Sequence, residues 1–224
     1  IVVCPATLKL NWANEVRKWR KDLTPYICQV RDGFKLPAKG DVVILNYDIL
    51  PQEFEPTDKY GYEHNIPELW VKVFKKTTAI FDEAHLCKSY KATRSKRAKV
   101  LALECKNAWA VTGPPLMSNP IDLWGVLSTF GMAKTVFGSW SGFLRNMNGT
   151  KGRYGYHFDK PDESVPERMR RVMLRRMKDD VLSDLPQKQI QNLVVDLSAP
   201  LKQQVTKAWG KMQELNLDRL PQFD

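Results

Sequence analysis

The stretch TTAIFDEAHLCKSYKATRSKRA, residues 77–98, places an apolar run directly before two adjacent carboxylates, a histidine and a series of basic side chains. The run 78–81 predicts a buried strand, and Asp82 and Glu83 then lie at its carboxyl end, where open α/β sheets bind ligands. Two interpretations follow. The carboxylates form the metal and water site of a nucleotide hydrolase, or they merely begin a basic, solvated helix, whose positive dipole end favours acids.

Similar short apolar runs, rich in Val, Ile or aromatic residues, occur at 1–4, 26–30, 42–45 and 108–111. Continuous runs of this kind are typical of parallel strands that are buried on both faces. Between them lie helical patterns, such as the apolar spacing of Leu8, Trp12, Val16 and Trp19. Trp12 and Trp19 are expected to pack this helix on the sheet. Residues 1–130 are therefore predicted to form an α/β domain with a mostly parallel sheet flanked by helices.

The character of the chain changes after residue 130. Residues 131–165 contain scattered glycines and aromatics without a clear period, which predicts a loop-rich insertion. In the last part, 166–224, the segments 168–182 and 201–217 have helical character, and 190–198 alternates as a strand does. These residues are predicted to form a helical extension.

Composition and charge narrow the function classes. With 224 residues, 43% of them hydrophobic, the chain fits a folded protein and not a disordered one. Its formal charge of +10 favours a polyanionic partner, most commonly nucleic acid. The four cysteines include no C-x-x-C pair, which argues against a disulfide framework or a zinc ribbon.

The ends of the chain and its apolar content bear on its location. It opens on a strand pattern without an initiator Met, so we expect an N-terminally truncated sequence. The absence of a signal peptide or a membrane-spanning run of about 20 apolar residues predicts an intracellular protein, cytoplasmic if bacterial or phage and nuclear if eukaryotic.

Phosphoryl transfer explains why a strand would end on two carboxylates. Such a site needs one carboxylate to hold Mg²⁺, usually through water, and a second group to orient or deprotonate the attacking water. Asp82 suits the first role and Glu83 the second. Thr112 and Gly113, at the end of the run 108–111, could hydrogen-bond back toward His85 and link this site to a neighbouring surface.

A family resemblance rests on these residues. The letters Asp-Glu-Ala-His at 82–85, followed by AVTGPPLMSNPIDLW at 110–124, resemble motifs II and III of superfamily 2 helicase-like ATPases of the Swi/Snf type. Three further segments resemble this family in the same order: IVVCPATLKLNWANEVRKW at the start, DVVILNYDIL at 41–50, and VMLRRMKDDVLSDLPQKQ at 172–189. The last is most similar to the annealing-helicase (HARP-like) branch and its bacterial or phage relatives.

The resemblance implies a RecA-like (P-loop NTPase) first lobe, which binds ATP and Mg²⁺ and moves along duplex or forked DNA together with a second RecA-like lobe of the same polypeptide. It implies that Asp82 coordinates Mg²⁺ through water, that Glu83 positions the attacking water, and that His85, Thr112 and Gly113 couple nucleotide state to DNA binding. The residues that would contact DNA, without reading its sequence, are Pro5, Thr7, Lys9, Asn46, Tyr47, Arg175, Arg176 and Lys178.

Departures from the family pattern keep alternatives open. The sequence contains no G-x-x-x-x-G-K-[ST] phosphate loop, and Pro114 stands where the family usually has Thr. In the family that loop precedes the first matched segment, so we expect this polypeptide alone to be inactive. The alternative is a non-catalytic module that retains the fold and only binds nucleic acid or a partner. A DEAH-type RNA helicase is a further possibility, although residues 172–189 fit the Swi/Snf type better.

Overall fold

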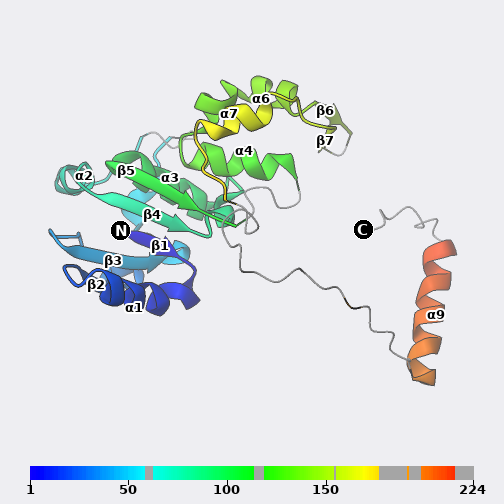
Figure 1. Cartoon of the computed structure of the whole chain (residues 1–224), viewed down its shortest axis with the longest axis horizontal. Coiled ribbons are helices and arrows are strands. Elements are labelled where there is room, and N and C mark those ends of the chain that lie inside the picture. The colour runs from blue at the N-terminus through cyan, green and yellow to red at the C-terminus, as the bar shows by residue number, and fades with distance from the viewer. Residues whose placement is uncertain (59–62, 114–118, 154, 177–190, 192–197, 215–224) are drawn as a thin grey trace. The chain divides into compact units, whose positions relative to one another are not determined.

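The computed structural model describes residues 1–58, 63–113, 119–153, 155–176, 191 and 198–214. The chain divides into two compact units, Ile1–Leu174 and Arg175–Asp224. Five strands of the first unit form one sheet in the order β2-β3-β1-β4-β5, and all neighbouring pairs are parallel (Figure 1). The strands are β1 (Val2–Cys4), β2 (Thr24–Ile27), β3 (Asp41–Asn46), β4 (Thr78–Asp82) and β5 (Asn107–Val111). The predicted α/β class with a mostly parallel sheet is confirmed.

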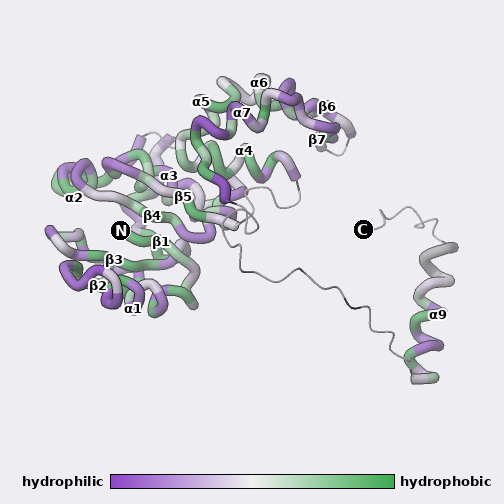
Figure 2. Tube along the Cα trace, viewed as in Figure 1, coloured by the Kyte–Doolittle hydropathy of each residue, from purple (hydrophilic) through white to green (hydrophobic). Residues whose placement is uncertain are grey.

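Side chains of the central strands alternate between two apolar layers, because successive residues of a strand point to opposite faces. Val2, Cys4 and Ile44 pack with Ala13 of α1 (Lys9–Trp19), whereas Val3 and Leu45 join a larger cluster on the other face. That larger cluster includes residues of α2 (Glu68–Phe74) and α3 (Thr93–Glu104). Figure 2 shows the hydrophobic residues concentrated along the strands at the centre of the sheet.

Two details of this packing differ from the sequence predictions. Trp12 is partly buried between α1 and the sheet, as expected. Trp19, however, is 69% exposed, and its indole donates to Glu15. The edge strands β2 and β5 are not buried on both faces, since Tyr26 is exposed in β2 and Trp109 and Val111 are exposed in β5. The reason is position, because each of these strands has a neighbouring strand on one side only.

Short 3-10 turns follow several strands. They are η1 (Ala6–Leu8), η2 (Arg31–Gly33), η3 (Tyr47–Ile49), η4 (Gln52–Phe54) and η5 (Ala84–Cys87). Four of them lie just beyond the carboxyl end of β1, β2, β3 or β4, so these ends continue into tight, well-defined backbone turns.

Residues 131–165 are more regular than the predicted loop-rich insertion. After α4 (Pro120–Thr129), they form α5 (Ala133–Phe137), α6 (Trp140–Asn146) and an antiparallel hairpin, β6 (Gly149–Gly152) with β7 (Gly155–Phe158). The scattered aromatics explain this order. Trp140 stacks on Phe143, with ring centroids 5.2 Å apart, and both belong to an apolar cluster shared by α4, α5 and α6.

Of the helix predicted over 168–182, the structure describes residues 168–176, and only 168–170 of these are helical. α7 (Val165–Arg170) ends where Val172 and Met173 fold back by hydrogen bonds to the Met169 carbonyl and pack against the same cluster. Tertiary packing thus overrides helix propensity here. The division of the chain at residues 130 and 165 stays a prediction.

The second unit contains α9 (Ala199–Glu214), which confirms most of the helix predicted over 201–217. The strand predicted at 190–198 lies almost entirely outside the described residues. None of the helices described is both long and apolar enough to cross a membrane.

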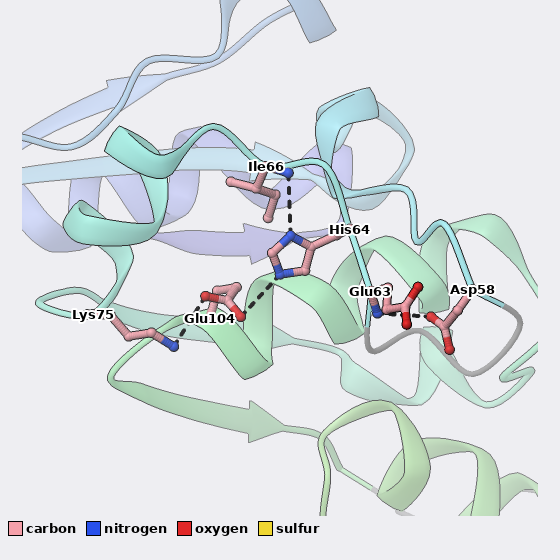
Figure 3. Close-up of polar contacts among 6 residues, drawn as sticks. All are labelled: Asp58, Glu63, His64, Ile66, Lys75 and Glu104. Atoms are coloured by element: carbon pink, nitrogen blue, oxygen red, sulfur yellow. Dashed lines mark hydrogen bonds and ion pairs between the residues drawn. The ribbon is translucent and has the colours of Figure 1, made fainter.

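A polar cluster ties the loop after η4 to the end of α3 (Figure 3). The backbone N–H of Ile66 donates to His64 Nδ1, so the remaining ring nitrogen, Nε2, can donate to Glu104, 3.2 Å away. Lys75 Nζ lies 3.2 Å from the other Glu104 oxygen. Burial would raise the pKa of Glu104, but the hydrogen bonds from His64 and Lys75 outweigh it, and the pKa falls below its ordinary value of 4.5.

We predict that Glu104→Gln destabilises the fold at pH 7 by about 1 kcal/mol, because a charged acceptor is lost. A carboxyl whose pKa is lowered by folding stabilises the fold above its ordinary pKa, and this contribution disappears as the pH falls. The difference between wild type and variant in urea unfolding should therefore shrink below about pH 4.5. Glu68→Gln is the matched control, since its pair with Lys72 is exposed. A constant difference down to pH 3 would contradict the assignment.

Candidate active site at the carboxyl edge of the sheet

The candidate site forms where β1, β3 and β4 end side by side. Cys4 at the end of β1 pairs with Asn46 at the end of β3, and Val3 pairs with Phe81, one residue before Asp82. The parallel register therefore brings segments that are far apart in the chain to one edge. Asp82 is the last residue of β4 and is half-buried there.

Hydrogen bonds from different segments fix the orientation of Asp82. Trp12 Nε1 donates to Oδ2 at 2.8 Å, and the backbone N–H of Glu83 donates to Oδ1 at 2.9 Å. The Tyr47 hydroxyl donates to the Asp82 backbone carbonyl at 2.8 Å. Each carboxylate oxygen keeps lone-pair capacity toward the open side, because an ionised carboxylate has about four acceptor sites. The sequence held no signal for Trp12 or Tyr47 as partners of Asp82.

Glu83 has an unusual backbone. Its φ of 49° and ψ of 48° place it in the left-handed region, which non-glycine residues rarely occupy. Such strain tends to occur at functional sites, where the surrounding structure maintains it. The turn re-aims the chain after β4, so the Glu83 side chain remains 41% exposed beside His85.

One nitrogen of His85 faces two oxygens. His85 Nδ1 lies 3.1 Å from Glu83 Oε2 and 3.2 Å from Thr112 Oγ1. When Nδ1 carries the proton it donates to the Glu83 carboxylate, and when it does not it accepts from the Thr112 hydroxyl. The contact expected between Thr112 and His85 is therefore present. Gly113, the next residue, is exposed.

The structure argues against the helix-cap interpretation of the acidic pair. The carboxylates precede η5, and α3 begins ten residues after Glu83, at Thr93. The Glu83 side chain makes no capping hydrogen bond to η5. Both carboxylates instead take part in the contacts at the strand end.

Helix α4 supports the segment that follows the acidic pair. A Cβ added to Gly125 would lie 1.6 Å from the backbone oxygen of Lys88, so α4 can approach this segment only with glycine at that position. The Thr129 hydroxyl lies near the Cys87 carbonyl, and Lys88 Nζ is 3.5 Å from Asp122. The backbone just after His85 is thus packed against α4.

Three of the residues predicted to contact DNA are buried, which corrects that expectation. Lys9 is 8% exposed and its ammonium donates to the Cys28 carbonyl at 2.9 Å. Asn46 is 8% exposed, and Tyr47 is 2% exposed with its hydroxyl on Asp82. Burial raises the pKa of Tyr47 far above its ordinary value, so it stays a neutral donor. These side chains belong to the interior of the sheet edge.

The other predicted contacts are accessible or lie elsewhere. Thr7 is exposed and Pro5 is half-buried, both beyond the end of β1. Arg175 and Arg176 are exposed residues of the second unit and lie beyond the end of α7. Lys178 and Pro114 lie outside the described residues.

Two further arginines occupy the same edge: Arg31, which no sequence motif included, and Arg94, which belongs to the basic run after the Asp-Glu-Ala-His segment. Arg31, just past β2, donates to the Asp48 carbonyl, and Arg94, in the first turn of α3, lies 3.9 Å from the Asp48 carboxylate. They line a shallow cavity of about 290 Å³, together with the first residues of α3. Arg97, from the basic run after the Asp-Glu-Ala-His segment, also borders this cavity, but it is only 8% exposed and its guanidinium donates to the Leu50 carbonyl and the Glu55 carboxylate.

Comparison with known proteins identifies the family. A family model described as the SNF2-related domain matches residues 1–219. The chain belongs to this family. The resemblance to Swi/Snf-type superfamily 2 helicase-like ATPases drawn from the motifs is thereby confirmed.

Two curated relatives illustrate the SNF2-related similarity. "DNA annealing helicase and endonuclease ZRANB3" of Bos taurus is 25% identical over 228 residues, which cover 97% of this chain and 20% of that protein. "TATA-binding protein-associated factor mot1" of Schizosaccharomyces pombe is 25% identical over 210 residues, covering 88% of this chain and 10% of that protein. The chain thus spans a fifth or less of the length of these relatives.

A solved structure supports the fold. This structure, "Sulfolobus solfataricus SWI2/SNF2 ATPase core in complex with dsDNA", aligns with 98% of this chain and 42% of its own, at a TM-score of 0.56 and 24% identity. The RecA-like fold expected for this SNF2-related domain is therefore confirmed.

We predict that Gly125→Ala destabilises the domain by several kcal/mol, because the backbone of α4 or of Lys88 must move to relieve the overlap. Thermal unfolding of wild type and variant measures this. Gly210→Ala in α9 is the control, since a Cβ there meets nothing within 4 Å and alanine favours helix. Equal stability of Gly125→Ala and wild type would disprove the close approach.

Proposed function

We propose that this SNF2-related domain is the first RecA-like lobe of a DNA-dependent ATPase that moves along duplex DNA. One observation carries the proposal: Asp82 and Glu83 sit at the carboxyl end of a central parallel strand, with Asp82 oriented by Trp12 and Glu83 in contact with His85. A helix cap would not need such support. The double-stranded DNA in complex with the Sulfolobus ATPase core favours DNA as the polyanion.

The Asp82 carboxylate fits Mg²⁺–ATP. It is half-buried, faces the ligand-binding edge of a parallel sheet and retains free lone pairs, which suits a metal bound through water. When bound, Mg²⁺ neutralises charge on the transferring phosphate. Trp12 and the Glu83 N–H hold the carboxylate in one orientation, so less reorganisation is needed for binding.

We propose that Glu83 orients the attacking water and that His85 changes its hydrogen bonding when Glu83 does. Because one nitrogen of His85 serves either Glu83 or Thr112, a change at the carboxylate changes the hydrogen bond to the end of β5. Thr112 and the exposed Gly113 continue into the surface beyond that strand. This chain of contacts is the proposed coupling between hydrolysis and DNA binding.

The DNA phosphates are proposed to contact the same edge through accessible groups. Thr7, Arg31 and Arg94 all lie beyond strand ends or at the start of α3. They replace Lys9, Asn46 and Tyr47, which are buried. Arg175, Arg176 and Lys178 remain proposed contacts from the segment leading to a second RecA-like lobe. The annealing-helicase branch remains a proposal, favoured by the name of the ZRANB3 relative.

For the full-length protein we predict that Glu83→Gln reduces DNA-stimulated ATP hydrolysis by at least about 100-fold while ATP binding is retained, since only the group that orients water is lost. Phosphate release and ATP affinity, each measured with and without duplex and forked DNA, test this. Glu15→Gln on the outer surface of α1 is the matched control. Undiminished turnover in Glu83→Gln would refute its role, and a wild-type protein that binds DNA without any turnover would favour a non-catalytic binding module.

We also predict that Arg31→Ala and Arg94→Ala each weaken the binding of duplex DNA, and that the loss of affinity does not depend on the DNA sequence. Each lost phosphate contact should reduce the slope of log affinity against log salt by about 0.9. Arg20→Ala is the control, because Arg20 follows α1 at the opposite edge of the sheet. If the slope of log affinity against log salt were unchanged in both Arg31→Ala and Arg94→Ala, this surface would not be the DNA-binding surface.

A further inference from the structure

A second cavity lies between α3, α4 and the segment 131–140, and its lining includes neither Asp82 nor Glu83 nor His85. Its volume is about 370 Å³, within the range of small-ligand sites. Residues of α3 that line it, Lys96 and Lys99, differ from Arg94 and Arg97, which line the cavity at the DNA edge. The proposed function makes no use of this second cavity.

Positive charge gathers at this cavity. Three lysines line it, Lys96 and Lys99 from α3 and Lys134 from α5, and among the described residues its lining includes no Asp or Glu. Burial lowers the pKa of Lys99, partly offset by Asp58 nearby, so one acidic group lies within range of that ammonium. Lys134 is exposed and Lys96 is half-buried, at positions where an anion can reach them.

Planar aromatic surfaces form other parts of the wall. Trp124 and Trp140 contact each other edge to face, with centroids 5.2 Å apart, and Trp140 stacks on Phe143. These contacts hold both indoles in place, so the rings need not be ordered when a ligand binds. Tyr90 lines the cavity as well and is 49% exposed. Rigid rings at an accessible cavity are the surfaces on which nucleic-acid bases stack.

A hydroxyl without a partner lies in the same wall. Ser128 Oγ is buried and has no hydrogen-bond partner among the described residues, although Ser128 lines the cavity. A buried polar atom left unpaired costs free energy, so this part of the wall is polar as well as aromatic. The small residues Gly131, Ala133 and Gly138 leave the space open.

We propose that this cavity binds a nucleotide, with the phosphate on the lysines and the base against the aromatic wall. A simple anion would use Lys96 and Lys134 but not the rings, and an apolar ligand would use the rings but not these charges. The nucleotide can be free or an unpaired residue of a nucleic-acid strand, because both present the same base, sugar and phosphate. The inference stands independently of the activity at Asp82, since it uses other residues.

The test uses the full-length protein without ATP, because an ATP analogue would itself compete for a nucleotide-binding cavity. Binding of a fluorescent oligothymidylate and competition by free thymidine monophosphate are then measured for wild type, Lys96→Ala/Lys134→Ala and the control Lys151→Ala, an exposed lysine of the hairpin. Oligothymidylate carrying 5-iododeoxyuridine, cross-linked by light, locates the contact by mass spectrometry.

The expected result is cross-linking to Tyr90, Trp124 or Trp140, and binding about tenfold weaker in the double variant but unchanged in the control. Oligothymidylate binding with this pattern identifies a nucleic-acid strand as the source, and competition by the monophosphate with the same sensitivity identifies a free nucleotide. Cross-links confined to other peptides, equal binding by all variants, or competition by inorganic phosphate as strong as by the monophosphate would each overturn the proposal. Turnover stimulated by duplex DNA should stay unchanged in the double variant, so failure here is separable from failure at Asp82.

Discussion

The parallel pairing of β1 with β3 on one side and β4 on the other is the constraint on which the candidate site depends. Parallel strands place all their carboxyl ends at one edge, so residues far apart in the chain must meet there. This register brings the Tyr47 hydroxyl to the Asp82 carbonyl and the Trp12 indole of α1 to the Asp82 carboxylate. A slip of one residue would turn each side chain to the opposite face and separate these groups.

The close approach of α4 adds rigidity to this edge. Gly125 lets the helix meet the backbone of Lys88, and the contacts around Thr129 keep the segment after the acidic pair from relaxing. The strained backbone of Glu83 is therefore supported on both sides, by the strand before it and the helix behind it. Such support maintains a conformation that an isolated turn would abandon.

Much of this arrangement was predictable from local patterns. The apolar runs located four of the five strands closely, while the run 26–30 overlaps β2 only at its last two residues. The position of Thr112 at a strand end anticipated its contact with His85. The directions of individual side chains were not predictable. Lys9, Asn46 and Tyr47 were expected to face DNA, yet each side chain points into the sheet edge, because the neighbouring strand offers a buried partner or a close-packed surface. Arg97 also turned inward, because the Leu50 carbonyl and the Glu55 carboxylate, both next to 3-10 turns, accept from its guanidinium.

The sequence by itself determined the class of fold, the order of the motifs and the place of the carboxylates at a strand end, because these depend on the periodicity and identity of neighbouring residues. Only the tertiary structure decided which side chains hold Asp82, which arginines remain accessible at the edge, and that aromatic rings and lysines from α3, α4 and α5 line one cavity. These features depend on contacts between residues tens of positions apart. Local sequence carries no record of such distances, since packing of the whole sheet and its helices sets them.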